Sequence, residues 1–172
     1  MILELIDRHY KTREFTNLAD LFIKDPPLLN ELVNVATSDL NHPYPEYASW
    51  LLIHIIKKHP ELVAPYQSQL IDKILVSNNQ SVLRNLINTT ISLPLIEHKE
   101  SAFLDKLIEF IKDDSNKVAL FVYSIYKLIQ FIQKYPEIKP EIMGIIELKQ
   151  AKEMQPSIKV SIRNFLKATK DL

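Results

Sequence analysis

Residues 46–76 read EYASWLLIHIIKKHPELVAPYQSQLIDKILV, two strongly apolar runs separated by a proline. Both runs, residues 46–58 and residues 62–76, have the length and the apolar spacing of helices. Pro60 ends the first run, because proline cannot continue the backbone hydrogen bonding of a helix. Pro65 falls in the first turn of the second run, where proline is tolerated. The stretch therefore predicts two helices joined by a proline turn.

The same unit recurs along the chain. Prolines at the ends of apolar runs are separated by 34, 34 and 42 residues, at Pro26, Pro60, Pro94 and Pro136. A second marker opens the next helices at steps of 35, 36 and about 40, at Tyr47-Ala48, Val82-Leu83, Val118-Ala119 and Ile158-Lys159-Val160. Two interleaved periods in the mid-thirties indicate a repeat array, whose helix pairs bury their apolar faces against neighbouring pairs.

The fold class is predicted to be all-α. Glycine occurs once, at Gly144. Tight hairpins and phosphate-binding loops need glycine, so the chain lacks the residues for sheet turns and for nucleotide loops of the GxGxxG or GxxxxGK type. We expect helices over residues 2–10, 13–24, 28–37, 46–58, 62–76, 82–93, 99–112, 117–134, 140–149 and 156–168. A serine of the polar turn 77–81 is expected to cap the helix that follows it.

Residues 118–132 form the most apolar segment. Their polar residues, with Lys134 beyond them, recur at steps of three and four, at Ser124, Lys127, Gln130 and Lys134. This spacing predicts one narrow polar stripe on a central helix whose other sides are buried. The segment is shorter than the ~20 residues that a bilayer requires.

Composition narrows the class of protein. The chain has 172 residues, 47% of them hydrophobic, enough for a single domain over residues 1–172 that buries roughly 70% of the surface exposed when unfolded. The 21 basic residues balance the 21 acidic ones, which gives no general attraction to nucleic acid or anionic lipid. Cysteine is absent, which excludes disulfides and thiolate chemistry. The first residues contain acids where a secretory signal has an apolar core, so we expect a cytoplasmic protein.

A polar turn, a helix, a proline and a second helix together resemble HEAT and armadillo-type repeats. Residues 77–84, Ser-Asn-Asn-Gln-Ser-Val-Leu-Arg, resemble the turn between HEAT repeats, with Arg84 where that family often has an arginine that ties the turn. The resemblance covers about residues 13–169. It implies a right-handed α-α superhelix, a HEAT-like solenoid of about four helix pairs and a terminal helix.

Three segments, residues 25–29, 48–52 and 156–159, resemble more narrowly a group of short bacterial HEAT-like proteins often labelled adenylosuccinate lyase. That enzyme activity implies a flexible loop of the pattern Ser-Ser-x-x-Met-Pro-x-Lys-x-Asn and a much longer helical bundle. This chain has neither. We therefore expect the lyase label not to describe its activity.

Side chains that could act in catalysis or bind a metal are spread along the chain. The histidines are His9, His42, His54, His59 and His98. His54 and His59 are five positions apart and fall on different helix faces, unlike ligands at i and i+4, so no metal or cofactor is predicted. Glu97, His98 and Glu100 lie together in an expected loop with no implied pocket. The acids Asp105, Glu109, Asp113 and Asp114 are expected to form a solvated face with Lys106 and Lys112. No catalytic constellation, and therefore no enzyme, is predicted.

Aromatic residues form the best candidate for a binding site. Tyr44, Tyr47, Trp50 and His54 follow one another at steps of three and four from the proline-rich loop along one helix. Tyrosine and tryptophan are common anchors of protein interfaces. The alternative is structural: Trp50 would fill the seam between the first two repeats, and Tyr44 would pack under its own loop.

Two classes of function follow from these features. The first is a non-catalytic scaffold that binds a protein partner, because stacked helix pairs offer a continuous surface and the sequence adds no chemistry. The second is a nucleic-acid-binding or DNA-repair module. It would require a basic groove that collects Lys73, Lys106, Lys149 and their neighbours.

Overall fold

The computed structural model describes residues 2–12 and 18–172, and these residues form helices and turns without a strand. Two compact units are present, Met1–Leu93 and Pro94–Leu172. The N-terminal unit contains α1 (Ile2–Thr12), α2 (Leu18–Lys24), α3 (Pro26–Ala36), α4 (Tyr44–Ile56), α5 (Pro60–Val63), η1 (Ala64–Tyr66), α6 (Gln67–Val76) and α7 (Gln80–Ile91). The C-terminal unit contains α8 (Glu100–Lys112), α9 (Val118–Lys134), η2 (Pro136–Ile138), α10 (Lys139–Gln150) and α11 (Pro156–Ala168).

The all-α fold class and the proline-bounded helix pairs are confirmed. Asp25 caps α3, because its Oδ1 accepts a hydrogen bond from the Leu28 amide at 3.0 Å while Pro26 occupies the first helical position. Part of the expected helix 13–24, residues 13–17, lies outside the described residues. Whether the chain is one domain stays a prediction.

Three local expectations were wrong. The expected helix 62–76 is broken into α5, a 3-10 turn and α6, because Pro65 lacks the amide that a continuous helix needs. α4 begins at Tyr44, two residues early, because Pro45 occupies its first turn, where amides have no helical partner. α7 is capped by Asn79, not by a serine: its Oδ1 accepts from the Ser81 and Val82 amides.

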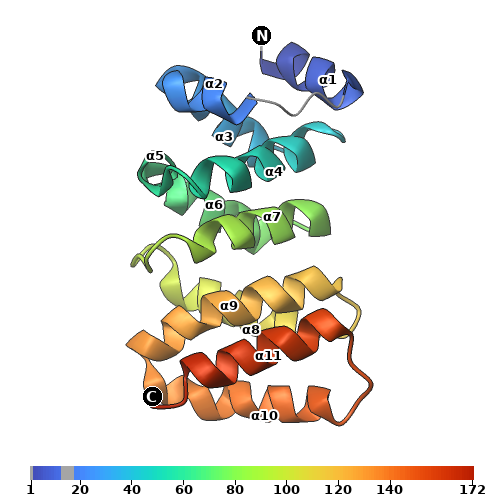
Figure 1. Cartoon of the computed structure of the whole chain (residues 1–172). Coiled ribbons are helices and arrows are strands. Elements are labelled where there is room, and N and C mark those ends of the chain that lie inside the picture. The colour runs from blue at the N-terminus through green and yellow to red at the C-terminus, as the bar shows by residue number, and fades with distance from the viewer. Residues whose placement is uncertain (1, 13–17) are drawn as a thin grey trace. The chain divides into compact units, whose positions relative to one another are not determined.

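In the N-terminal unit, α4 is the central helix. It packs against α3 on one side and α7 on the other, and also contacts α1 and α2 (Figure 1). Its inner side chains, such as Ala48, Leu52 and Ile55, are fully buried. α6 packs against α7 and so completes the pair that α5 and η1 introduce. The first helix of one repeat therefore rests on the first helix of the next.

In the C-terminal unit, α9 has the same role. It packs against α8 and α11, and α10 contacts α8 (Figure 1). Leu128, Phe131 and Ile132 of α9 are fully buried, and the ring of Phe131 meets that of Phe103 in α8 edge to face, with centroids 6.0 Å apart. Within the described ranges, every helix is too short or too polar to span a bilayer.

The polar stripe expected on α9 is not a solvent-exposed face. Lys134 is exposed and Gln130 is half-buried, but Ser124 and Lys127 are fully buried. Lys127 Nζ donates a hydrogen bond to Gln130 Oε1 at 2.8 Å. Burial lowers the pKa of Lys127 from 10.5 to about 7. Spacing on one helix gives the side that a residue occupies, but the neighbouring helices decide whether that side meets water.

Polar contacts between neighbouring repeats recur at the repeat period. They join side chains 34, 35 or 38 positions apart, namely Asn34 to Gln69, Asp39 to Lys73, Glu100 to Lys134, Asp114 to Lys149 and to Lys152, and Tyr126 to Asn164. The hydrogen bonds from Lys149 and Lys152 hold the pKa of Asp114 at about 2. The period read from prolines thus also spaces the polar contacts that hold adjacent helix pairs together.

Asn85 makes the most buried contact of this kind. Its Nδ2 lies 3.2 Å from the Glu46 carbonyl oxygen and 3.1 Å from Ser49 Oγ, so it connects α7 to α4. Asn85→Ala should lower the free energy of unfolding by about 1–3 kcal/mol, because buried polar atoms lose their donor. Asn88→Ala, on the same helix but without a hydrogen bond to the described residues, is the matched control. Equal urea midpoints for the two variants would show that the contact contributes nothing.

Candidate functional site

A surface pocket of about 290 Å³ lies in the N-terminal unit, where α1, α4 and α7 come together. Aromatic side chains of α1 and α4 line it beside polar and charged ones from α4, α7 and the loop before α4; the lining residues are Tyr10, His42, Pro43, Glu46, Tyr47, Trp50, Ser81, Arg84 and Asn85. We call it the aromatic pocket. Its volume lies near the lower limit for ligand pockets, so it suits one side chain or a small molecule better than a large cofactor.

The rings of the pocket contact one another in series. The Tyr10 ring meets Tyr47 edge to face, with centroids 5.9 Å apart, and meets His42 in the same way at 6.0 Å. Tyr47 and Trp50 have centroids 5.4 Å apart, and Trp50 and His54 are 4.3 Å apart. Aromatic pairs in these geometries attract one another and hold the rings in place. The walls are therefore preformed.

The structure brings together only part of the aromatic set named from the sequence. Tyr47 and Trp50 line the pocket, and His54, outside the lining, meets the Trp50 ring edge to face. Burial, with the charge of Lys57, lowers the pKa of His54 and so favours its neutral imidazole. Whether these residues bind a partner stays a prediction.

Tyr44 has a structural contact instead. Its hydroxyl donates to Asp7 Oδ2 of α1 at 3.2 Å, and this hydrogen bond raises the pKa of Tyr44. The residue thus ties α4 to α1, which is a different contact from the expected packing under its own loop. Trp50 is half-buried, so one part of its indole packs against protein and another is accessible.

Glu46 places a negative charge in the pocket. Burial opposes ionisation, but hydrogen bonds from Asn79 and from its own backbone amide, together with His42, lower the pKa of Glu46. Its Oε1 accepts from Asn79 Nδ2 at 2.7 Å. Its Oε2 is buried and has no hydrogen-bond partner among the described residues, and the same holds for the Tyr47 hydroxyl. Unsatisfied buried polar atoms are uncommon in native proteins and point to a missing donor or acceptor.

Apart from Tyr47 and Trp50, the lining residues were not named as site residues from the sequence. Tyr10 and His42 join the site from α1 and from the loop before α4, at distances along the chain that helix periodicity does not cover. Arg84, expected to tie the inter-repeat turn, is exposed and forms no hydrogen bond or ion pair with the described residues. Asn79 and Asn85 make the inter-repeat contacts in its place.

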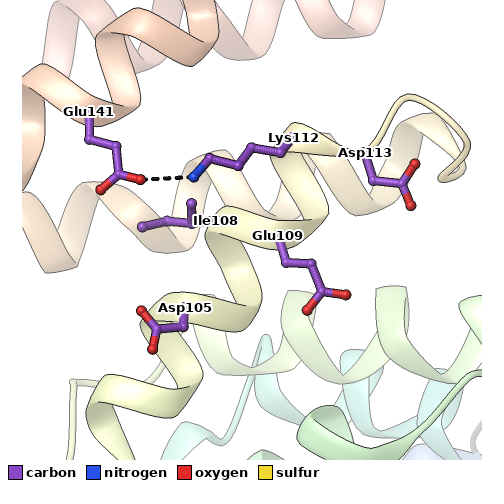
Figure 2. Close-up of a pocket in the computed structure, with 6 residues that line it drawn as sticks. All are labelled: Asp105, Ile108, Glu109, Lys112, Asp113 and Glu141. Carbon is purple, nitrogen blue, oxygen red and sulfur yellow. Dashed lines mark hydrogen bonds and ion pairs between the residues drawn. The ribbon is translucent and has the colours of Figure 1, made fainter.

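A second pocket, of about 470 Å³, lies in the C-terminal unit between α8 and α10. Figure 2 shows its four carboxylates around Ile108, with Lys112 paired to Glu141 at 2.9 Å. Lys106 pairs with Glu109 at 3.0 Å, as the expected solvated face requires. Lys112, however, pairs across to α10, and Asp114 pairs with Lys149 and Lys152. These ion pairs link α8 and the turn after it to α10 and the turn after it.

Two other polar residues named from the sequence, Lys73 and Glu100, also have structural partners. Lys73 pairs with Asp39 at 2.5 Å, and Glu100, from the expected acid and imidazole cluster, pairs with Lys134 at 2.8 Å. In the described part of the chain, histidine and acidic side chains do not gather in threes that could hold a metal ion.

A family model for the HEAT repeat domain matches residues 4–169, which include most of both units. None of the curated proteins or solved structures compared with the chain matches it. The matched segment has the paired helices, the proline turns and the first-helix stacking described above. The chain therefore belongs to the HEAT repeat domain family.

Proposed function

We propose that the protein is a non-catalytic interaction module, and that a partner protein docks at the aromatic pocket. The observation that carries the proposal is the composition of the pocket. Tyrosine, tryptophan and arginine dominate the residues that contribute most to binding at protein interfaces, and here Tyr10, Tyr47, Trp50 and Arg84 line one hollow. HEAT repeats commonly offer surfaces of this kind, since stacked helices present side chains at fixed positions.

The proposal includes the absence of catalytic activity. Glu100 and Asp114 form ion pairs between helices, and Glu46 and His42 line the aromatic pocket. We therefore propose that the protein acts in the cytoplasm as a scaffold and that an adenylosuccinate lyase label does not describe its activity.

Affinity capture with matched variants tests the proposed surface. Tagged protein carrying Tyr10→Ala and Trp50→Ala should lose, by about tenfold or more, the proteins that the wild type captures from a cell extract. Asp105→Ala with Glu109→Ala, at the second pocket, should leave them unchanged. Thermal unfolding by circular dichroism checks that both double variants are folded. Equal capture by the wild type and by a folded aromatic-pocket variant would contradict the proposal.

The nucleic-acid alternative would need a basic groove that collects Lys73, Lys106, Lys149 and their neighbours. Each of these lysines forms an ion pair, with Asp39, Glu109 and Asp114 respectively. Paired lysines release fewer counterions on binding phosphate and so contribute less affinity. No specific observation on the described residues therefore favours this alternative over a protein partner.

A further inference from the structure

We propose that the aromatic pocket binds a cationic side chain, an arginine presented by the partner protein, with Glu46 as its counter-charge and the rings of Tyr10, Tyr47 and Trp50 as its walls. This inference rests on the proposed function, because it names the group of the partner that enters the site. It follows from the charge of the pocket and from the arrangement of its rings.

The carboxylate of Glu46 favours a positively charged hydrogen-bond donor as the occupant of the pocket. Its Oε1 accepts from Asn79 and lies 3.5 Å from His42 Nδ1, while its Oε2 is buried without a hydrogen-bond partner among the described residues. The Glu46 side chain is 20% exposed, so its field is screened less by water than that of a fully solvated acid. A guanidinium presents several N–H groups in one plane and forms charge-assisted hydrogen bonds with a carboxylate.

The rings favour a cation over a neutral group. An aromatic face attracts a positive charge within about 6 Å of its centroid, and tryptophan and tyrosine do so best. Tyr10, Tyr47 and Trp50 form a connected wall with centroid separations of 5.9 and 5.4 Å. Arginine also stacks flat on such rings, and its guanidinium loses less hydration than an ammonium does. The site volume of about 290 Å³ has room for one such side chain.

Arg84 is the feature that would favour an anion instead. It lines the same pocket and is unpaired among the described residues, but it is exposed, so water and salt screen its charge. Glu46 lies deeper and its charge is screened less. The two possible occupants therefore make opposite demands: an anion requires Arg84, whereas a cation requires Glu46 and gains when Arg84 is removed.

Trp50 makes the test direct, because it is the only tryptophan of the chain and it lines the pocket. The probes are N-acetyl-arginine amide and N-acetyl-citrulline amide, which share a shape and differ in charge. Titration should change Trp50 fluorescence with the arginine probe, with a dissociation constant of roughly 1 mM, because one side chain carries only part of the affinity of a complex. The citrulline probe should bind at least about tenfold more weakly. This comparison uses wild-type protein and needs no variant.

Variants then identify the groups responsible. Glu46→Gln should weaken arginine binding by about tenfold, because the amide keeps the shape and loses the charge. Arg84→Met should leave it unchanged or strengthen it by up to about threefold. Lys57→Met, at the residue that follows α4 and outside the pocket lining, is the control and should have no effect. N-acetyl-lysine amide and N-acetyl-glutamate amide complete the series, and lysine should bind more weakly than arginine.

Each outcome of these titrations either supports the cationic occupant or overturns it. Arginine binding that Glu46→Gln weakens and Arg84→Met does not supports a cationic occupant. Equal binding of arginine and citrulline overturns it, as does binding of the glutamate probe that depends on Arg84. If no probe binds while Tyr10→Ala with Trp50→Ala still abolishes capture of partners, the cationic occupant is wrong and the protein-binding surface stands. If capture is also unaffected, both proposals fail.

Discussion

Lys127→Met is expected to raise the free energy of unfolding by roughly 2–4 kcal/mol at pH 7. Lys127 is fully buried in α9, and burial lowers the pKa of its ammonium to about 7. Half of the folded molecules must therefore hold a buried positive charge at that pH, or the residue must give up a proton that the unfolded chain keeps. Methionine has a similar unbranched shape without this cost.

The same residue makes stability depend on pH. Between about pH 7 and pH 10.5, Lys127 is protonated in the unfolded chain and largely neutral in the folded one, so the unfolded state binds more protons. Stability must then rise with pH through this window, by up to about 1.4 kcal/mol per pH unit. Below pH 7 the group is charged in both states and its contribution no longer changes, while the full cost of burying the charge remains.

Urea unfolding followed by circular dichroism, repeated at several pH values between 6 and about 9, measures both effects. Lys127→Met should have the higher midpoint throughout, and its midpoint should depend less on pH than that of the wild type. The exposed Lys167→Met is the matched control and should change neither quantity. A Lys127→Met protein that is less stable than the wild type, with the same pH dependence, would show that Lys127 contributes a favourable buried contact.

Phe131→Ala should lower the free energy of unfolding by about 3–5 kcal/mol. The Phe131 side chain is fully buried between α9 and its neighbours and packs edge to face against Phe103 of α8. Its truncation loses apolar burial, leaves a cavity and removes the ring contact. Because one helix pair supports the next, the loss should be felt across the C-terminal unit and not at one side chain alone.

The control for Phe131→Ala lies two residues away. Gln133 is exposed on the same helix, so Gln133→Ala should change the urea midpoint by the equivalent of less than about 0.5 kcal/mol. Similar midpoint shifts for Phe131→Ala and Gln133→Ala would mean that the buried face of α9 has been misassigned.

Most of the fold could be predicted from the sequence, because local chemistry sets helix ends. Pro26, Pro60 and Pro136 each lie just beyond a helix, since a proline ring excludes the preceding turn whatever the tertiary structure. Pro65 shows the limit of such predictions, because the effect of a proline depends on where its helix begins. The helix was expected to begin near residue 62 but begins at Pro60, so Pro65 lies beyond its first turn and breaks it.

The candidate site could be predicted only where its residues share one helix. Tyr47 and Trp50 lie three residues apart on α4, and helix geometry places them together. Tyr10 and Arg84 come from helices far away in the sequence, and periodicity within one helix holds no information on which helices meet. Lys127 was misplaced for the same reason: its side of α9 was read correctly, but its burial depends on the packing of other helices.

Polar contacts between side chains 34, 35 and 38 residues apart restrict how such a chain can change in length. A duplication or deletion of one whole repeat brings each side chain to a position equivalent to that of its former partner. A change of a few residues inside a helix instead rotates every later side chain of that helix by about 100° per residue. Evolution of this fold by gain and loss of entire repeats is therefore the route that preserves its internal contacts.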